Sequence, residues 1–291
     1  MFLPINMKYK GLLGYLFASI ISLILIYYAF DSVDVQDVWP ESISAVFPFI
    51  EHVPYRLIPF SQKANRAYLA ADKLVAVSET YLERAQLANT TARGLVVFIG
   101  ADMDEIEKAV PWPLDESRIH FLYMGAMGAS YDLKTVLNAF RTLENEECNF
   151  SLHIAGGGSQ EKKLRRFFGK NVIFHGPLPY TKLISLGKSV DFFINPIKNS
   201  SAASITNKLS DYIALGKPII SCQNSREVDE LIRSVGGEFY QSGNVSSLLL
   251  SLKEMARRKP SAVAACPGSV MMRFDRRLTY PLIEDFIKDS S

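Results

Sequence analysis

Short apolar runs alternate with longer amphipathic stretches from residue 118 onward, and this alternation is the dominant pattern of the chain. A short apolar run bounded by turn residues predicts a buried strand, and apolar residues three and four apart predict a helix packed on it. The predicted strands cover residues 119–124, 150–155, 172–174, 192–195, 218–221 and 237–240. The predicted helices cover residues 133–143, 161–168, 180–186, 207–215, 227–235 and 245–258. This succession of strand-then-helix units predicts an α/β fold, a doubly wound parallel sheet with helices on both faces.

Residues 31–100 carry a weaker version of the same pattern. They predict strands at 32–35, 73–77 and 95–99 and helices at 62–71 and 79–88, the second helix capped by Ser78. Prolines and acidic residues at 100–113 interrupt the pattern and predict a hinge. The predicted organisation is a shortened N-terminal domain over 1–100, a complete α/β domain over 101–265, and a tail over 266–291 with a helix at 280–288.

Residues 11–30 contain no charged side chain, and this stretch is long enough for a membrane span. Lys8 and Lys10 precede it, while Asp31 and Asp34 follow it. The positive-inside rule would therefore place the rest of the chain outside the cytoplasm. A buried helix or one lying on a membrane surface is the alternative to a span.

Composition narrows the class of protein. Hydrophobic residues make up 48% of the chain and charged residues 21%, which permits a sizeable core. The net charge is +2, and no face or tail is strongly basic. Both observations argue against a nucleic-acid binder. Cys148, Cys222 and Cys266 have no paired spacing, and the four histidines have no ligand spacing. Neither a disulfide framework nor a metal site is predicted, and His120 and His153 are expected in strands.

Three of the predicted strand-to-helix turns are rich in glycine. The turns contain Gly125 with Gly128, then Gly156, and then Gly176. Glycine lets a backbone approach a phosphate closely, and the amides of a helix N-terminus favour its negative charge. Each turn taken alone also fits a purely geometric role. Because all three fall at the carboxyl ends of parallel strands, they predict a ligand site at that edge of the sheet.

Residues 204–218, SITNKLSDYIALGKP, hold the polar side chains with the clearest chemical meaning. Thr206 is placed to cap a helix that begins at Asn207. Lys208 and Asp211 are three residues apart and are neighbours on that helix. A lysine at a helix N-terminus suits a diphosphate, and a carboxylate suits a ribose diol. A solvated helix start with a Lys–Asp pair is the alternative that composition leaves open.

Residues 95–258 resemble the donor domain of glycosyltransferase family 4, also called group 1. The resembling segments are VVFIGADMDE, FLYMGAMGASYDLKTVLNAF, LHIAGGGSQEKKL, NVIFHGPLPYTKL, DFFINPI and SITNKLSDYIALGKPII. The last is similar to the asparagine-lysine, acidic-tyrosine and Gly-Lys-Pro pattern of bacterial polysaccharide transferases. Upstream, VQDVWPESI and ADKLVAVSETYLERA resemble parts of the N-terminal domain of that subgroup.

The resemblance implies a GT-B-like fold with an intact donor-binding half and a shortened acceptor-binding half. It implies a retaining, metal-independent transfer from a UDP-linked or similar nucleotide-sugar, without a cofactor. The acceptor would be a lipid-linked sugar or glycan of a bacterial surface polysaccharide such as capsule or O-antigen. The chain would then work in the cytoplasm, peripheral to the inner face of the plasma membrane, with a single N-terminal span as the alternative.

The same resemblance assigns roles to individual residues. The lysine of the asparagine-lysine pair contacts phosphates. The acid before the tyrosine binds the ribose, and the first glycine turn approaches the pyrophosphate. Two acids near the start are candidates for the acceptor side of the cleft, although a turn and a helix start explain them equally. The implied donor-binding residues are Gly125, Gly128, Gly156, Gly176, Ser204, Asn207, Lys208 and Asp211, and the catalytic candidates are Asp37 and Glu41.

The chain also departs from the family pattern. Many members carry an acid eight positions before the ribose acid, where this chain has Ala203, and cations after the first glycine, where it has Ala126 and Tyr131. A non-catalytic or partner-dependent nucleotide-binding remnant is therefore a second hypothesis. A UDP-sugar epimerase is a third, and it would need paired acid/base carboxylates that the sequence does not show. Asp102 and Asp104 form an Asp-x-Asp, but within the hinge segment, so no metal site is predicted there.

Overall fold

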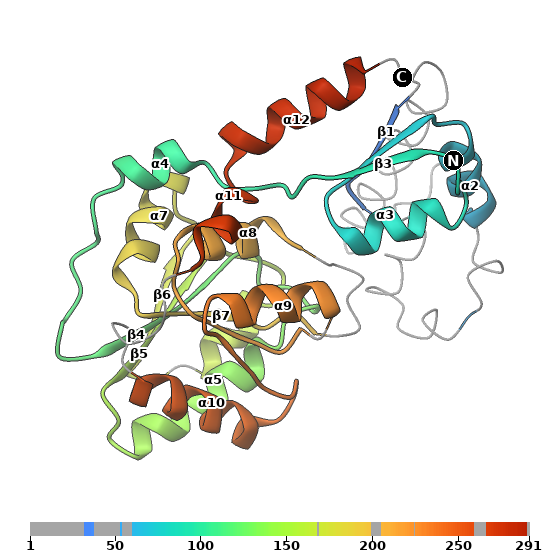
Figure 1. The fold of residues 1–291 in the computed structure, drawn as a ribbon. Coiled ribbons are helices and arrows are strands. Elements are labelled where there is room, and N and C mark those ends of the chain that lie inside the picture. Colours follow the sequence, from blue (N-terminus) through green and yellow to red (C-terminus); the bar gives the residue numbers. More distant parts are fainter. Residues whose placement is uncertain are drawn as a thin grey trace, which may run out of the picture.

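The computed structural model describes residues 32–37, 53, 60–167, 169–198, 205–223, 225–258 and 266–289. Within these residues the strands form two separate parallel sheets, one of three strands and one of six (Figure 1). The predicted α/β fold class with parallel sheets is therefore confirmed. The apolar stretch at 11–30 lies outside the described residues. Among the described helices, none is long and apolar enough to cross a membrane.

The larger sheet has the strand order β6-β5-β4-β7-β8-β9 in the described part of the chain. Consecutive strands run outward from β4 in one direction and from β7 in the other, so the order reverses between these two central strands. Doubly wound sheets bind ligands at this reversal, outside the carboxyl ends of the strands. The strands are β4 (Ile119–Met124), β5 (Phe150–Ala155), β6 (Val172–Gly176), β7 (Phe192–Asn195), β8 (Ile219–Ser221) and β9 (Glu238–Phe239).

Two hydrophobic clusters hold helices against the two faces of this sheet. Phe121 and Tyr123 of β4 belong to one cluster, and Leu122 and Met124 belong to the other, because side chains alternate along a strand. All six residues of β5 are buried, as expected for a strand covered on both faces. The helices are α5 (Leu133–Asn145), α6 (Glu161–Leu164), α7 (Tyr180–Ser189), α8 (Asn207–Ala214), α9 (Arg226–Ser234) and α10 (Val245–Arg258). The prediction for residues 161–168 was too long, because α6 gives way to a 3₁₀ turn at Arg165–Phe167.

The smaller sheet has the order β1-β2-β3 within the described residues. Its strands are β1 (Ser32–Val35), β2 (Lys73–Ala76) and β3 (Arg93–Val96), and its helices are α2 (Ser61–Leu69) and α3 (Glu79–Gln86). Ser78 caps α3 as predicted, since its side chain accepts a hydrogen bond from the Tyr81 amide at 3.2 Å. The third strand begins and ends earlier than the predicted 95–99, because the pairing with β2 stops at Val96.

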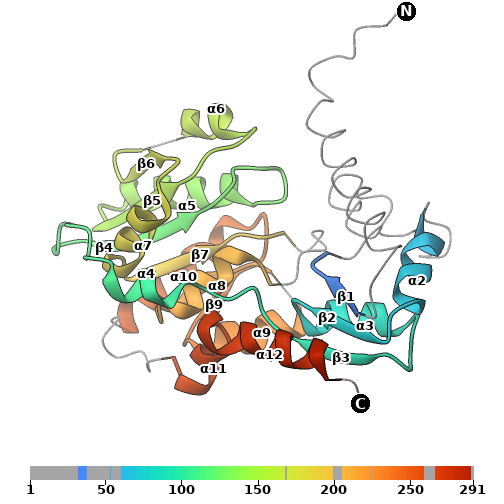
Figure 2. The same cartoon turned by 90° about the horizontal axis from the view of Figure 1, so that it is seen from above.

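The hinge and the tail contain helices that join the two sheets. The prediction for the hinge missed α4 (Met103–Lys108), and the tail holds α11 (Gly268–Met272) and a longer α12 (Arg276–Lys288) than expected. α12 runs from the larger domain to the side of β3 (Figure 2). At its far end, Lys73 of β2 donates to the Ile287 carbonyl at 3.0 Å and Arg93 of β3 pairs with Asp289 at 2.8 Å. A cation at the C-terminal end of a helix is stabilising, so the tail helix is fixed to the smaller sheet.

Candidate functional site

The central strands β4 and β7 separate at their carboxyl ends, and a tyrosine of α8 fills the gap. The two strands pair only at Phe121–Phe192 and Leu122–Phe193. Beyond this point the Tyr212 hydroxyl accepts from the Met124 amide at 3.0 Å and donates to the Ile194 carbonyl at 3.4 Å. The fully buried Tyr212 ring also stacks on Phe193. The tyrosine of the acidic-tyrosine pair therefore fixes α8 at the reversal point of the sheet.

Lys208, on the first turn of α8, reaches across this gap to the end of β4. A Cβ atom on Gly125 would lie 3.0 Å from the Lys208 Nζ, so only glycine leaves room for the ammonium there. The Lys208 Nζ lies 3.3 Å from the Tyr123 hydroxyl and 3.6 Å from the centre of the Tyr131 ring. Burial lowers the pKa of Lys208 to about 7. The structure thus brings together Lys208, the N-terminus of α8 and Gly125, the glycine that follows β4.

The three glycine turns lie side by side, and they are held together by backbone hydrogen bonds. The Gly125 amide donates to the Ala155 carbonyl, the Met127 amide to the Gly157 carbonyl, and the Gly156 amide to the Gly176 carbonyl, each at 2.8 Å. A Cβ atom on Gly156 would collide with the carbonyl of Gly125. The amides of Gly125 and Gly156 thus form hydrogen bonds between the turns.

Asp211 is buried, and its contacts differ from those of Lys208. The Tyr180 hydroxyl, at the start of α7, donates to the Asp211 carboxylate at 2.8 Å. Burial raises the pKa of Asp211 to about 6, while the hydrogen bond from Tyr180 and the charge of Arg276 oppose this shift. Tyr180 was missed by the sequence analysis, although its position directly after a glycine- and proline-rich turn was a signal. The Tyr180 hydroxyl therefore already binds one oxygen of the carboxylate that would hold a ribose.

The remaining predicted site residues lie less centrally or outside the described part. Asn207 is exposed at the start of α8, and Asp37 is exposed beyond the end of β1. Thr206 occupies the N-cap position of α8, but its side chain makes no capping hydrogen bond, so that prediction was wrong. A Cβ atom on Gly128 would lie 3.9 Å from the edge of the Tyr131 ring. Ser204 and Glu41 lie outside the described residues.

The Asp-x-Asp of the hinge has structural partners. Asp102 caps α4 by accepting from the Glu105 amide at 3.1 Å, and Asp104 pairs with Arg277 of α12 at 2.8 Å. Arg277 also pairs with Glu107 at 3.0 Å. Asp104 and Glu107 therefore join the hinge to the tail helix.

Three histidines that are far apart in the sequence form one hydrogen-bonded row across β4, β5 and β6. His120 Nδ1 lies 2.9 Å from His153 Nε2, and His153 Nδ1 lies 2.9 Å from His175 Nε2. His120 Nε2 must donate to the Asp115 carbonyl at 2.9 Å, so each ring in turn donates from Nε2 when neutral. Burial lowers the pKa of His153 to about 3. His120 and His153 are buried in strands as predicted, but their spacing gave no sign of the row.

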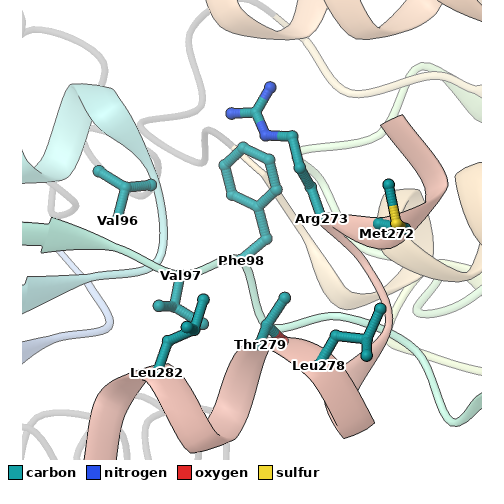
Figure 3. Close-up of a pocket in the computed structure, with 8 residues that line it drawn as sticks. All are labelled: Val96, Val97, Phe98, Met272, Arg273, Leu278, Thr279 and Leu282. Atoms are coloured by element: carbon teal, nitrogen blue, oxygen red, sulfur yellow. The ribbon is translucent and has the colours of Figure 1, made fainter. Parts of the chain in front are cut away.

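A groove of about 320 Å³ lies between β3, α11 and α12 (Figure 3). Apolar side chains dominate its lining, and Arg273 is the charged residue among them. The Arg273 guanidinium lies 4.5 Å from the centre of the Phe98 ring, so this charge is already in contact with an aromatic face. The groove shares no lining residue with the site around Lys208, and its chemistry does not suit a nucleotide.

Comparisons with known proteins agree with this fold. The sequence profile of the family described as glycosyl transferases group 1 matches residues 118–257, and no curated protein matches the chain. Among solved structures, the chain is similar to the apo lipopolysaccharide outer core galactosyltransferase WaaB, with 18% identity and a TM-score of 0.60 over 97% of this chain and 81% of that one. It is similar to sucrose-phosphate synthase of Thermosynechococcus elongatus, with 13% identity and a TM-score of 0.66 over 95% and 70%. It is also similar to HepE of Anabaena in complex with UDP and glucose, with 13% identity and a TM-score of 0.62 over 99% and 84%.

The similar structures share one class of fold, the GT-B fold of glycosyltransferases, and the chain has that fold. Within that class, residues 118–257 match group 1, and these residues form the six-stranded domain with Lys208 and Asp211. The predicted resemblance of the donor half to group 1 is therefore confirmed. The assignment to family 4 and the surface-polysaccharide subgroup stay predictions.

Proposed function

We propose that this chain is a retaining, metal-independent glycosyltransferase that moves a sugar from a UDP-linked donor to a lipid-linked or glycan acceptor. The observation that carries the proposal is the Lys208 ammonium held over Gly125 at the reversal point of the sheet. A cation beside a helix N-terminus at this point suits the diphosphate of a nucleotide-sugar. The UDP and glucose of the HepE structure support such a donor, and the similarity to WaaB supports a bacterial surface glycan as the acceptor class.

In the proposed reaction the acceptor hydroxyl oxygen bonds to the anomeric carbon while the bond from that carbon to the diphosphate oxygen breaks. The departing diphosphate takes the proton of the acceptor hydroxyl, so no protein nucleophile is required. The chain then acts by orienting the two substrates and by stabilising the charge on the diphosphate through Lys208. Asp211 would hold the ribose, and Asp37 and Glu41 remain candidates for the acceptor side. We place the reaction at the cytoplasmic face of the membrane.

Titration of the full chain with UDP and with GDP tests the donor site. Lys208→Ala and Asp211→Ala are each expected to weaken nucleotide binding by about tenfold or more, because each removes a charged hydrogen-bonding partner. Lys253→Ala is the matched control, since Lys253 forms a surface ion pair with Glu146 at 2.6 Å. If the chain binds neither UDP nor GDP, the proposal is overturned.

Product analysis separates the proposed transferase from the two other hypotheses. Transfer to a lipid-linked glycan acceptor is expected from the enzyme. Nucleotide binding without transfer in the presence of acceptor would favour the remnant, a hypothesis supported by the alanine at position 203. Conversion of the UDP-sugar to another UDP-sugar without acceptor would favour the epimerase.

A further inference from the structure

Two tyrosine rings enclose the Lys208 ammonium from different sides. The Lys208 Nζ lies 3.6 Å from the centre of the Tyr131 ring and 4.8 Å from the centre of the Tyr123 ring. The two rings meet edge to face, with their centres 5.9 Å apart. An ammonium this close to aromatic faces is attracted by their negative charge density. We call Tyr123 and Tyr131 together the tyrosine cradle.

Hydrogen bonds fix the direction of the contact between Tyr123 and the lysine. The Tyr123 hydroxyl donates to the Ala126 carbonyl, so its oxygen is left to accept from the Lys208 Nζ at 3.3 Å. Tyr123 is itself fully buried within the core of the larger domain. This side of the cradle is therefore set by the strand and by the first glycine turn.

Backbone pairing fixes the other side of the cradle. Tyr131 forms a bridge with Ile197, which follows β7, and the Asp132 amide donates to the Pro196 carbonyl at 2.7 Å. The Lys198 amide donates to the Ser130 carbonyl at 3.0 Å. The segment that carries Tyr131 is thus joined to the segment after β7, on the opposite side of the gap between the strands.

We propose that Tyr131 is a positioning residue for donor binding: with Tyr123 it holds the Lys208 ammonium over Gly125, where the ammonium meets the diphosphate. This inference rests on the proposed function and deepens it, because it names the residue that positions the proposed phosphate-binding lysine. The ring supplies no charge, and it acts through the charge of Lys208. Burial lowers the pKa of Lys208, whereas the ring faces favour the ammonium and so oppose that shift.

The test is the affinity of the full chain for UDP between pH 5 and pH 9, a range that lies on both sides of the pKa of about 7 of Lys208. The second ionisation of a phosphate near pH 6 affects wild type and variants alike. Tyr131→Phe keeps the ring and is expected to bind UDP like the wild type. Tyr131→Leu removes the ring and is expected to weaken binding at pH 8 by about threefold to thirtyfold. It is also expected to lower the pH at which affinity falls by about half a unit or more, because the neutral lysine becomes favoured at lower pH.

The outcomes separate this inference from the proposed function. If Tyr131→Leu binds UDP as tightly as the wild type, or loses the same factor at every pH, Tyr131 has at most a structural role and the inference is wrong. If the wild type binds neither UDP nor GDP, the donor site itself fails. Should Tyr131→Leu melt below the assay temperature, Tyr131→Met replaces it and must show the same shift of the pH midpoint. Tyr123→Phe, which removes only the hydroxyl that accepts from Lys208, must shift the midpoint in the same direction.

Discussion

The turns after β4 and β5 both contain glycine, but for different physical reasons. At Gly125 the missing side chain leaves space that the end of Lys208 occupies. At Gly156 the missing side chain leaves space that the backbone of Gly125 occupies. The first turn therefore faces a flexible cation in the candidate site, and the second faces a rigid carbonyl within the fold. Glycine-rich turns at one edge of a sheet thus do not all touch a ligand, and the neighbour of the absent Cβ tells them apart.

Gly156→Ala is expected to have the largest effect on stability. The new Cβ would meet the Gly125 carbonyl, and the φ of 138° is one that side chains rarely adopt. Strain and overpacking together predict a loss of about 4 kcal/mol in the free energy of unfolding. Urea denaturation measures this loss. A loss under about 1 kcal/mol would mean that the second turn is not closed by backbone contact.

Asp211→Asn tests whether a charge beside the site costs stability. The pKa of Asp211 is raised from 3.8 to about 6, so the carboxylate is less favourable in the folded chain than in the unfolded one. Stability linked to this group is present below pH 3.8 and is lost as the pH rises through about 6. The variant should therefore be more stable than the wild type at pH 8, by up to about 3 kcal/mol, with most of the gain absent at pH 4. Urea denaturation at both pH values checks this, and a gain independent of pH would contradict it.

Gly125→Ala is expected to act on ligand binding more than Gly156→Ala does. Its Cβ would press on the Lys208 Nζ and Cε, which are the movable end of a side chain. The displaced ammonium should weaken UDP binding by about tenfold, or about 1.4 kcal/mol. Calorimetric titration of the folded variant measures the affinity. Unchanged affinity would show that Lys208 meets no ligand above Gly125.

Gly176→Ala is expected to have the smallest effect of these variants, and it measures the cost of an unfavourable φ alone. No atom lies within 4 Å of the position of its Cβ, so only the φ of 68° opposes the substitution. The expected loss is about 1 kcal/mol in urea denaturation, with UDP affinity unchanged. A loss as large as that of Gly156→Ala would remove the distinction between backbone strain and collision.

Much of the larger domain could be predicted because its signals are local. The bounds of β4, β5, β7 and α10 follow directly from where apolar runs and helical periods begin and end. The tail helix was predicted too short, since Arg276 to Thr279 form a helix start whose Asp275 cap was not recognised. The hinge helix α4 was missed for a similar reason, because Asp102 was treated as part of a possible metal motif and not as a cap.

The sequence by itself determined the α/β class, the succession of strands and helices, and the helix start that carries Lys208 and Asp211. Only the tertiary structure decided which side chains meet. Lys208 and Tyr123 are 85 residues apart, and the three histidines come from three different strands. Periodicity records which face of its own element a residue occupies, whereas such contacts depend on strand order and crossovers, which place distant segments side by side.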